Sequence, residues 1–134
     1  MAGFQQVAAV AVGGSIGALA RYATTSVALK LGLNDPRWAT LCVNVIGCVA
    51  IGWLLEGILG DRPPQDPTKL MLVTGLLGSL TTFSTFGYET WSWLSTGKLI
   101  AAGCWILANV VLGLVGVWIG TLIGGTVPGT GTPA

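Results

Sequence analysis

The chain has 134 residues, of which 52% are hydrophobic and only 8% are charged. Soluble domains carry about 25% charged residues, so the composition excludes a soluble fold and predicts an integral membrane protein. The net charge of +1 gives no electrostatic basis for binding nucleic acid. The absence of histidine removes the commonest general base and metal ligand, and no nucleophile–base pair is visible, so an enzyme is not expected.

Four apolar segments are long enough to cross a bilayer as helices, which takes about 20 residues each. In chain order they are residues 4–29, 38–59, 70–94 and 99–123. The connections between them are short, and the three prolines of residues 60–69 exclude a helix there. We therefore predict an all-α transmembrane domain of four helices over residues 1–125, followed by a flexible tail over residues 126–134.

Lysine and arginine give little indication of which way the helices cross the membrane. Arg62 and Lys69 lie on the side of the two termini, whereas Lys30, Arg37 and Lys98 lie on the other side. Because such residues normally collect on the cytoplasmic side, two against three is a weak bias. We therefore hypothesise that the chain inserts in both orientations and that the two products pair as an antiparallel dual-topology homodimer.

Glycines recur at four-residue spacing in two of the segments. Gly13 and Gly17 form a pair in the first segment, and Gly116, Gly120 and Gly124 form a row in the fourth. Small residues at this spacing allow the backbones of two membrane helices to approach closely. The pattern predicts a tight helix bundle and by itself indicates no activity.

Hydroxyl side chains are concentrated in residues 75–90, in the middle of the third segment, at Ser79, Thr81, Thr82, Ser84 and Thr85. Glycine and β-branched threonine weaken a helix, and hydroxyls compete for its backbone groups. We therefore predict that the third helix is broken at its centre. Backbone freed at membrane depth must be buried or line a cavity, and half-helix ends there commonly bind ions.

Two kinds of ion suit this stretch. Free carbonyls suit a cation such as Na⁺, whereas hydroxyl and amide donors suit a small anion. The rings of Phe83 and Phe86 favour an anion at their electropositive edges. The stretch has no basic residue, so an anion is held weakly, as conduction requires. Four helices enclose little space, so a polar path implies an oligomer or a path at a subunit interface.

Several further polar residues lie within the apolar segments. Asn44 and Asn109 each need hydrogen-bond partners in hydrocarbon, which either another helix or a polar path supplies. Arg21 either anchors the first helix at the interface or makes a positive vestibule that gathers anions. Glu56 and Glu89 lie near segment ends, where a functional role and a water-exposed or paired role are both open.

Three stretches of the sequence resemble the small fluoride channels of the CrcB/Fluc family. They are GGSIGALARY at residues 13–22, NVIG at residues 44–47 and GSLTTFSTFGYE at residues 78–89, within which TTFSTF is the most specific. The resemblance covers nearly the whole chain, including the four predicted spans. It implies an antiparallel dual-topology homodimer with two separate fluoride pores and a third helix broken at the TTFST run.

The resemblance also implies roles for individual residues. A structural Na⁺ that is not transported sits at the dimer centre, held by the backbone carbonyls that match Gly78 and Thr81. Arg21, expected in the vestibule, and Glu89 match charged positions of the family. The residues that match the pore are Phe83, Phe86, Asn44, Thr82, Ser84 and Thr85.

The chain departs from the family pattern at a few positions. Ser79 stands where relatives often have a second glycine. In the fourth helix the family usually has a tyrosine and, four residues later, a serine on the pore side, and the matching residues here are Trp105 and Asn109. The spacing agrees but the residue types differ. Asn109 is therefore assigned to the pore, with an altered polar track.

The implied function is passive export of fluoride from the cytoplasm through a multi-pass channel of the plasma (inner) membrane, which lowers fluoride toxicity. Two alternatives stay open. One is a small proton-coupled multidrug transporter, but this needs a carboxylate deep in a helix, and the first segment has no acid. The other is a non-conducting assembly subunit, in which the polar residues only join helices.

Overall fold

The computed structural model describes residues 3–33 and 35–125, and the elements within them are helical. The continuous helices are α1 (Phe4–Lys30), α2 (Arg37–Glu56) and α6 (Leu99–Gly125). The third membrane segment consists of consecutive shorter elements, which are α3 (Pro67–Lys69), the π-helix η1 (Leu70–Leu77), α4 (Gly78–Leu80) and α5 (Phe83–Leu94). The predicted tail over residues 126–134 lies outside the described residues.

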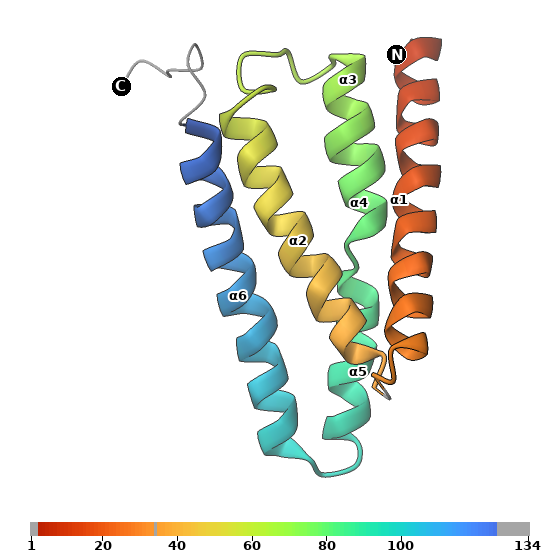
Figure 1. The fold of residues 1–134 in the computed structure, drawn as a ribbon, viewed down its shortest axis with the longest axis vertical. Helices are drawn as coiled ribbons and strands as arrows, with labels where there is room; N and C mark the ends of the chain where they lie inside the picture. The colour runs from red at the N-terminus through yellow and green to blue at the C-terminus, as the bar shows by residue number, and fades with distance from the viewer. Residues whose placement is uncertain (1–2, 34, 126–134) are drawn as a thin grey trace.

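Four helical segments in the described part of the chain are long and apolar enough to cross a membrane, and they are Phe4–Lys30, Arg37–Glu56, Pro67–Leu94 and Leu99–Gly125. This confirms the prediction of an all-helical, multi-pass membrane protein. Helix α1 begins and α6 ends at the same end of the bundle, as an even number of spans requires (Figure 1).

The second span is shorter than predicted. Helix α2 ends at Glu56 rather than at residue 59. The chain turns at Gly57, and the N–H of Leu59 donates to the carbonyl of Leu54 at 2.9 Å. The turn places the Leu59 side chain in the core, where it is only 1% exposed. Leu59 is therefore buried by the non-helical turn that follows α2, and not because the helix continues to residue 59.

The expectation that prolines exclude a helix from residues 60–69 is wrong at the end of this range. Pro67 is the first residue of α3. Proline is tolerated there because its missing N–H has no helical partner at the first position. Asp66 caps the helix, since its Oδ1 accepts the N–H of Lys69 at 2.9 Å. The same hydrogen bond holds the pKa of the Asp66 carboxyl below its usual value.

The first half of the third segment packs against α1. Gly13 and Gly17 of α1 are buried at this contact. A Cβ atom at Gly13 would overlap the backbone carbonyl of Met71, and one at Gly17 would overlap that of Leu76. The glycine pair therefore allows backbone-to-backbone contact, as predicted.

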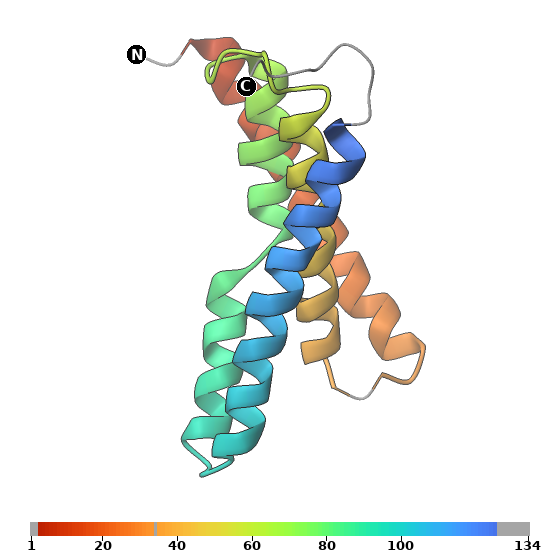
Figure 2. The same ribbon diagram turned by 90° about the vertical axis from the view of Figure 1, so that its left-hand side faces the viewer.

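The second glycine row brings α6 against α2, and the two helices lie side by side in Figures 1 and 2. Gly116, Gly120 and Gly124 are buried. A Cβ atom at Gly120 would overlap the carbonyl oxygen of Val49, and one at Gly124 would lie 2.8 Å from that of Trp53. The predicted close packing of the fourth segment is confirmed.

The two halves of the third segment have different neighbours. Elements η1 and α4 contact α1 and α2, whereas α5 contacts α2 and α6. Between α4 and α5, Thr81 has an extended conformation with ψ of 156°, and Thr82 has φ of −149° and ψ of 112°. Figure 2 shows the chain stepping sideways at this point, while the last turns of α1 diverge from α5.

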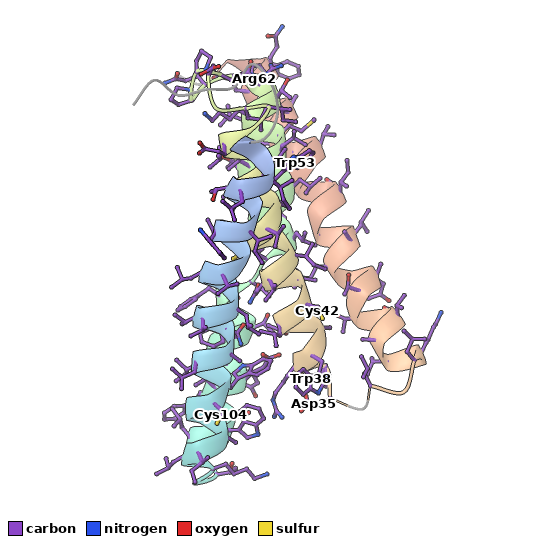
Figure 3. All side chains as sticks on the ribbon, turned by 60° about the vertical axis from the view of Figure 1, so that its left-hand side comes forward. Asp35, Trp38, Cys42, Trp53, Arg62 and Cys104 are labelled. Atoms are coloured by element: carbon purple, nitrogen blue, oxygen red, sulfur yellow. The ribbon has the colours of Figure 1, made fainter. Side chains whose placement is uncertain are left out.

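The outer surface of the single chain is apolar, and its ion pairs lie at the two ends. Figure 3 shows Arg62 at the end where α1 begins and Asp35 towards the opposite end. Arg62 pairs with Asp66 at 3.3 Å, and Asp35 pairs with Arg37 at 2.9 Å. Charge at the ends and apolar side chains between them are what a bilayer requires.

Candidate ion pathway

A cavity of about 380 Å³ lies between α2, the two halves of the third segment and α6. The predicted site residues that line it are Asn44, Gly78, Thr81, Thr82, Phe83, Phe86 and Asn109. They come from α2, α4, α5, α6 and the extended residues between α4 and α5, so the fold brings together groups that are far apart in the sequence. The other lining residues are small or apolar, apart from one cysteine. Amides and hydroxyls therefore give this cavity its polar character.

Thr82 is the centre of the hydroxyl cluster. Its side chain caps α5, because Oγ1 accepts the N–H of Thr85 at 3.3 Å. The same hydroxyl donates to Oγ1 of Thr85 at 2.9 Å and lies 3.3 Å from Oγ of Ser84. Thr82 is buried, whereas Ser84 and Thr85 are exposed in the single chain. Three of the predicted hydroxyls thus form one network at the start of α5.

The amide of Asn44 pairs with the backbone of Thr82. Oδ1 of Asn44 accepts the N–H of Thr82 at 2.9 Å, and Nδ2 donates to the carbonyl of Thr82 at 3.4 Å. In a continuous α-helix that N–H would donate to the carbonyl of Gly78. The Asn44 side chain therefore provides partners for backbone groups that the extended conformation of Thr82 withdraws from the helix.

Asn109 joins this arrangement from α6. Its Oδ1 accepts the Nδ2 of Asn44 at 3.3 Å, and its own Nδ2 donates to the carbonyl of Trp105 at 3.1 Å. From the sequence, these two amides were compatible with two interpretations, an interhelical hydrogen bond and a polar path. In the structure they hydrogen-bond to each other across α2 and α6 and also line the cavity.

Phe83 and Phe86 lie side by side at the start of α5. Their ring centroids are 5.6 Å apart and the ring planes are inclined at 54°. Phe83 is 83% exposed, whereas Phe86 is half-buried. Both rings line the cavity. A large ring this exposed at membrane depth faces either lipid or another protein chain.

Arg21 does not reach this cavity. It lines a second one of about 330 Å³ between α1, α2 and α5, together with Tyr22, Thr25 and Thr85. Thr82 lines both cavities. Arg21 is half-buried and forms no ion pair with any described residue. An unpaired guanidinium at this cavity is a source of positive potential.

Sequence reasoning missed Thr40, which lies next to the predicted residues. Its Oγ1 donates to Oε1 of Glu89 at 2.7 Å, and both side chains are buried. Both residues line a third cavity of about 330 Å³, which shares Thr25, Thr40 and Thr85 with the second. The signal was present, because Thr40 and Asn44 are four residues apart and so share a face of the helix. Glu89, whose role was left open, is thus buried, and one of its two carboxylate oxygens accepts a hydrogen bond from Thr40.

Trp105, which the sequence resemblance matches to a tyrosine position, fills the space between α2, α5 and α6. Its ring packs edge-on against Trp38 and Trp93, with centroids 6.3 and 5.8 Å away. The Nε1 atom of Trp105 is buried and has no hydrogen-bond partner among the residues described. The same is true of Oε2 of Glu89. An indole has only a donor, so this residue cannot replace every contact of a tyrosine hydroxyl.

Gly78 and Thr81, the predicted Na⁺ ligands, both line the first cavity. A Cβ atom at Gly78 would lie 3.8 Å from the carbonyl oxygen of Val73, an ordinary van der Waals contact. The methyl group of Thr81 packs against Gly47, where a Cβ atom would overlap it. No cluster of three histidine, cysteine or carboxylate side chains exists within residues 3–33 and 35–125.

Comparison with known proteins assigns the chain to a family. Residues 8–121 match the family described as CrcB-like protein, Camphor Resistance (CrcB). A curated relative from Chloroflexus aurantiacus, named fluoride-specific ion channel FluC, is 44% identical over 119 residues, which cover 88% of this chain and 94% of the relative. Proteins of the same name from Dehalococcoides mccartyi and Geobacter sulfurreducens are 39% and 40% identical. They cover 89% and 87% of this chain, and 92% and 94% of their own lengths are matched.

The matched region extends from α1 to α6. It contains Asn44, Asn109 and residues 82–86, which carry the hydroxyl cluster and the two phenylalanines. This confirms the resemblance found in the sequence, which rested on residues 13–22, 44–47 and 78–89. The chain belongs to the CrcB-like protein family.

Proposed function

We propose that this chain is the subunit of a fluoride channel in the cell membrane. The observation that carries the proposal is the Thr82 network, in which the hydroxyls of Ser84 and Thr85 each lie within hydrogen-bond distance of the Thr82 hydroxyl, and Thr82 itself lines two cavities. The relatives' name, fluoride-specific ion channel, supports the choice of ion. Fluoride is a small anion that hydroxyl donors and aromatic edges suit.

The arrangement suits passive conduction. Arg21 raises the local anion concentration at one cavity. Beyond it the Thr82 network offers neutral donors, and the rings of Phe83 and Phe86 offer their edges. Neutral donors bind an anion weakly enough for it to leave again, as conduction requires. Fluoride that enters a cell as hydrogen fluoride and ionises would then leave down its own gradient through the plasma membrane, which lowers its toxicity.

We expect the chain to conduct fluoride selectively when it is purified and placed in liposomes. Fluoride efflux should exceed chloride efflux by at least about tenfold, a barrier difference of about 1.4 kcal/mol. Phe83→Ile should lower fluoride efflux by roughly three- to tenfold, because it removes the ring edge and also the Phe83–Phe86 contact, an aromatic pair worth about 0.5–1.5 kcal/mol.

The matched control for Phe83→Ile is Phe4→Ile, which makes the same substitution at a residue that is 87% exposed and lines none of the three cavities described above. It should leave efflux unchanged. Absence of any anion efflux from correctly assembled protein would favour the non-conducting assembly subunit. Equal fluoride and chloride efflux would refute fluoride selectivity.

The proposal includes an antiparallel homodimer. Four helices enclose little space, and the cavity that holds the amides opens beside Phe83, which is 83% exposed. A second copy would cover this ring and close the path. The weak charge bias between the two ends of the bundle is consistent with insertion in both orientations.

The orientation can be measured by cysteine labelling. Ser95 is exposed in the turn between α5 and α6, so Ser95→Cys, in a chain whose three native cysteines are replaced by alanine, reports which side this turn faces. In intact cells a membrane-impermeant maleimide should label about half of the molecules, because equal insertion in two orientations leaves half of the turns outside. Labelling of all or none of the molecules would refute dual topology.

A structural Na⁺ at the centre of this dimer is also proposed. The donors on this chain are the backbone carbonyls of Gly78 and Thr81, which are hard oxygen ligands suited to a hard cation. The diversion of the Thr82 N–H to Asn44 favours a free carbonyl at Gly78, which that N–H would occupy in a continuous helix. Two copies would together bring twice as many carbonyls to the shared centre, and the cation would hold the two chains together.

A further inference from the structure

Helix α5 is not held in place by the rest of its membrane segment. Thr81 and Thr82 are extended, and the N–H of Thr82 donates to Oδ1 of Asn44 instead of to the preceding helix. A continuous helix passes its rotation and axial position from turn to turn, but two extended residues do not. The position of α5 along its neighbours must therefore come from its contacts with other helices.

Polar contacts between α2 and α5 form three successive rungs, which we call the α2–α5 seam. The residues on α2 are three and four positions apart, so they share one face of the helix, and they are Arg37, Thr40 and Asn44. Their partners follow in reverse order along the chain, and they are Ser92 with Trp93 for the first rung, Glu89 for the second and Thr82 for the third. The two helices therefore run antiparallel, with one rung at each of three levels.

The outer rung is made by Arg37, at a position where a helix disfavours a cation. Arg37 is the first residue of α2, and the N-terminus of a helix carries partial positive charge. Asp35 offsets this charge, because its Oδ2 lies 2.9 Å from Nη1 of Arg37 and its Oδ1 accepts the N–H of Arg37 at 3.0 Å. The guanidinium extends to α5, where it lies 4.1 Å from the centre of the Trp93 ring and donates to Oγ of Ser92 at 3.4 Å.

The Trp93 ring makes this rung sensitive to the axial position of α5. On its other side the ring packs edge-on against Trp105 of α6, with centroids 5.8 Å apart. A slide of α5 by one turn, about 5.4 Å, would take the ring away from both the guanidinium and Trp105. The contact between Arg37 and Trp93 is therefore present in one register of α5 against α2 and lost in the next.

We propose that Arg37 is a positioning residue that fixes the register of α5 against α2 through the Trp93 ring. It thereby keeps the hydroxyl network of Thr82 opposite Asn44, at the inner end of the seam. Partly buried polar pairs are best known for specifying register, a role in which their small contribution to stability matters little. This role also gives a reason for an arginine at the start of α2.

Hydrogen exchange at the backbone N–H of Thr82 tests this inference in the purified full-length chain. Thr82 lies before the first residue of α5, a helix of 12 residues that has Trp93 near its other end, so Arg37 acts on it only by moving α5. In Arg37→Gln this N–H should exchange about two- to fivefold faster, the factor expected when one cation–aromatic contact is lost. Arg37→Lys keeps a cation beside the ring and should recover part of the protection.

The matched control is Arg62→Gln. Arg62 also pairs with an aspartate, Asp66 at 3.3 Å, but it lies at the other end of the bundle and stacks on no ring among the residues described. Its loss should leave exchange at Thr82 unchanged. Trp93→Leu removes the contact from the α5 side, should also raise the rate, and serves if Arg37→Gln does not assemble.

Unchanged exchange at Thr82 in both Arg37→Gln and Trp93→Leu would overturn the proposal. Faster exchange confined to the first turn of α2 would do the same, since Arg37 would then act only on its own helix end. Acceleration spread evenly over all four spans would also count against it, because it would indicate general destabilisation. None of these results depends on whether the chain conducts fluoride.

The transport consequence rests on the proposed function. A displaced α5 would move the Thr82 network away from Asn44, so Arg37→Gln should lower fluoride efflux by a factor similar to its effect on exchange, and Arg37→Lys should lower it less. A chain that conducts no fluoride in any form would refute the proposed function, and exchange at Thr82 would still decide the role of Arg37.

Discussion

Asn44→Asp is expected to lower fluoride efflux by about a hundredfold. Asn44 lines the cavity, and two like unit charges about 6 Å apart at an effective dielectric constant of about 20 repel each other by roughly 3 kcal/mol. The substitution also replaces both N–H donors of Asn44 by an acceptor, which would face the carbonyl of Thr82 and Oδ1 of Asn109. Both effects act in the same direction, and efflux from liposomes measures their sum.

Two comparison variants separate these effects. Asn44→Leu removes the same hydrogen bonds without adding charge, so the difference between it and Asn44→Asp gives the electrostatic part. Gln5→Glu adds an equal charge at an exposed position at the start of α1 and should leave efflux unchanged. Normal efflux through correctly assembled Asn44→Asp would show that this residue lies away from the ion path.

Gly120→Ala is expected to destabilise the folded protein by about 1–3 kcal/mol, the cost of overpacking a tight contact. The new Cβ atom would overlap the carbonyl oxygen of Val49 and lie 2.9 Å from the backbone nitrogen of Trp53. Both neighbours are backbone atoms of α2, so they cannot move aside as a flexible side chain would. The helices must separate, and the α2–α6 contact weakens.

The control for Gly120→Ala lies on the same helix. Gly103 has no atom within 4 Å of the position that a Cβ would occupy. Gly103→Ala should therefore leave stability unchanged or raise it by up to about 1 kcal/mol through better helix propensity. The melting temperature in detergent, followed by tryptophan fluorescence, compares the two. Equal melting temperatures would contradict the assigned packing.

The positions of the four spans could be predicted from the sequence because the requirement for crossing a bilayer concerns each segment by itself. A helix of about 20 apolar residues is required to cross the bilayer, and the composition of each segment meets that requirement without reference to the others. The ends were less accurate for a physical reason. Leu59 continues the apolar run, but a turn at Gly57 buries it as well as a helix would. The first position of α3 accepts Pro67 because no N–H is needed there.

Some residues of the candidate site could be predicted from the sequence. Polar groups at membrane depth are costly, so Asn44, Asn109 and the hydroxyl run stood out in the sequence. Their hydrogen-bond partners could not be predicted in this way. The hydrogen bond between Asn44 and Asn109 joins residues 65 positions apart, and nothing in either local sequence indicates the other. Thr40 was overlooked because a single threonine near a helix end is ordinary until Glu89 is placed against it.

By itself, the sequence determined that this is a membrane protein with four apolar spans, a polar run in the third and close contacts at its glycines. These properties depend on composition and on helical spacing, which are local. Only the tertiary structure decided that the third segment divides its packing between α1 on one side of Thr82 and α6 on the other. It also decided that Asn44 and Asn109 meet at this junction, because the meeting depends on how α2, α5 and α6 cross, and crossing geometry arises from packing between helices.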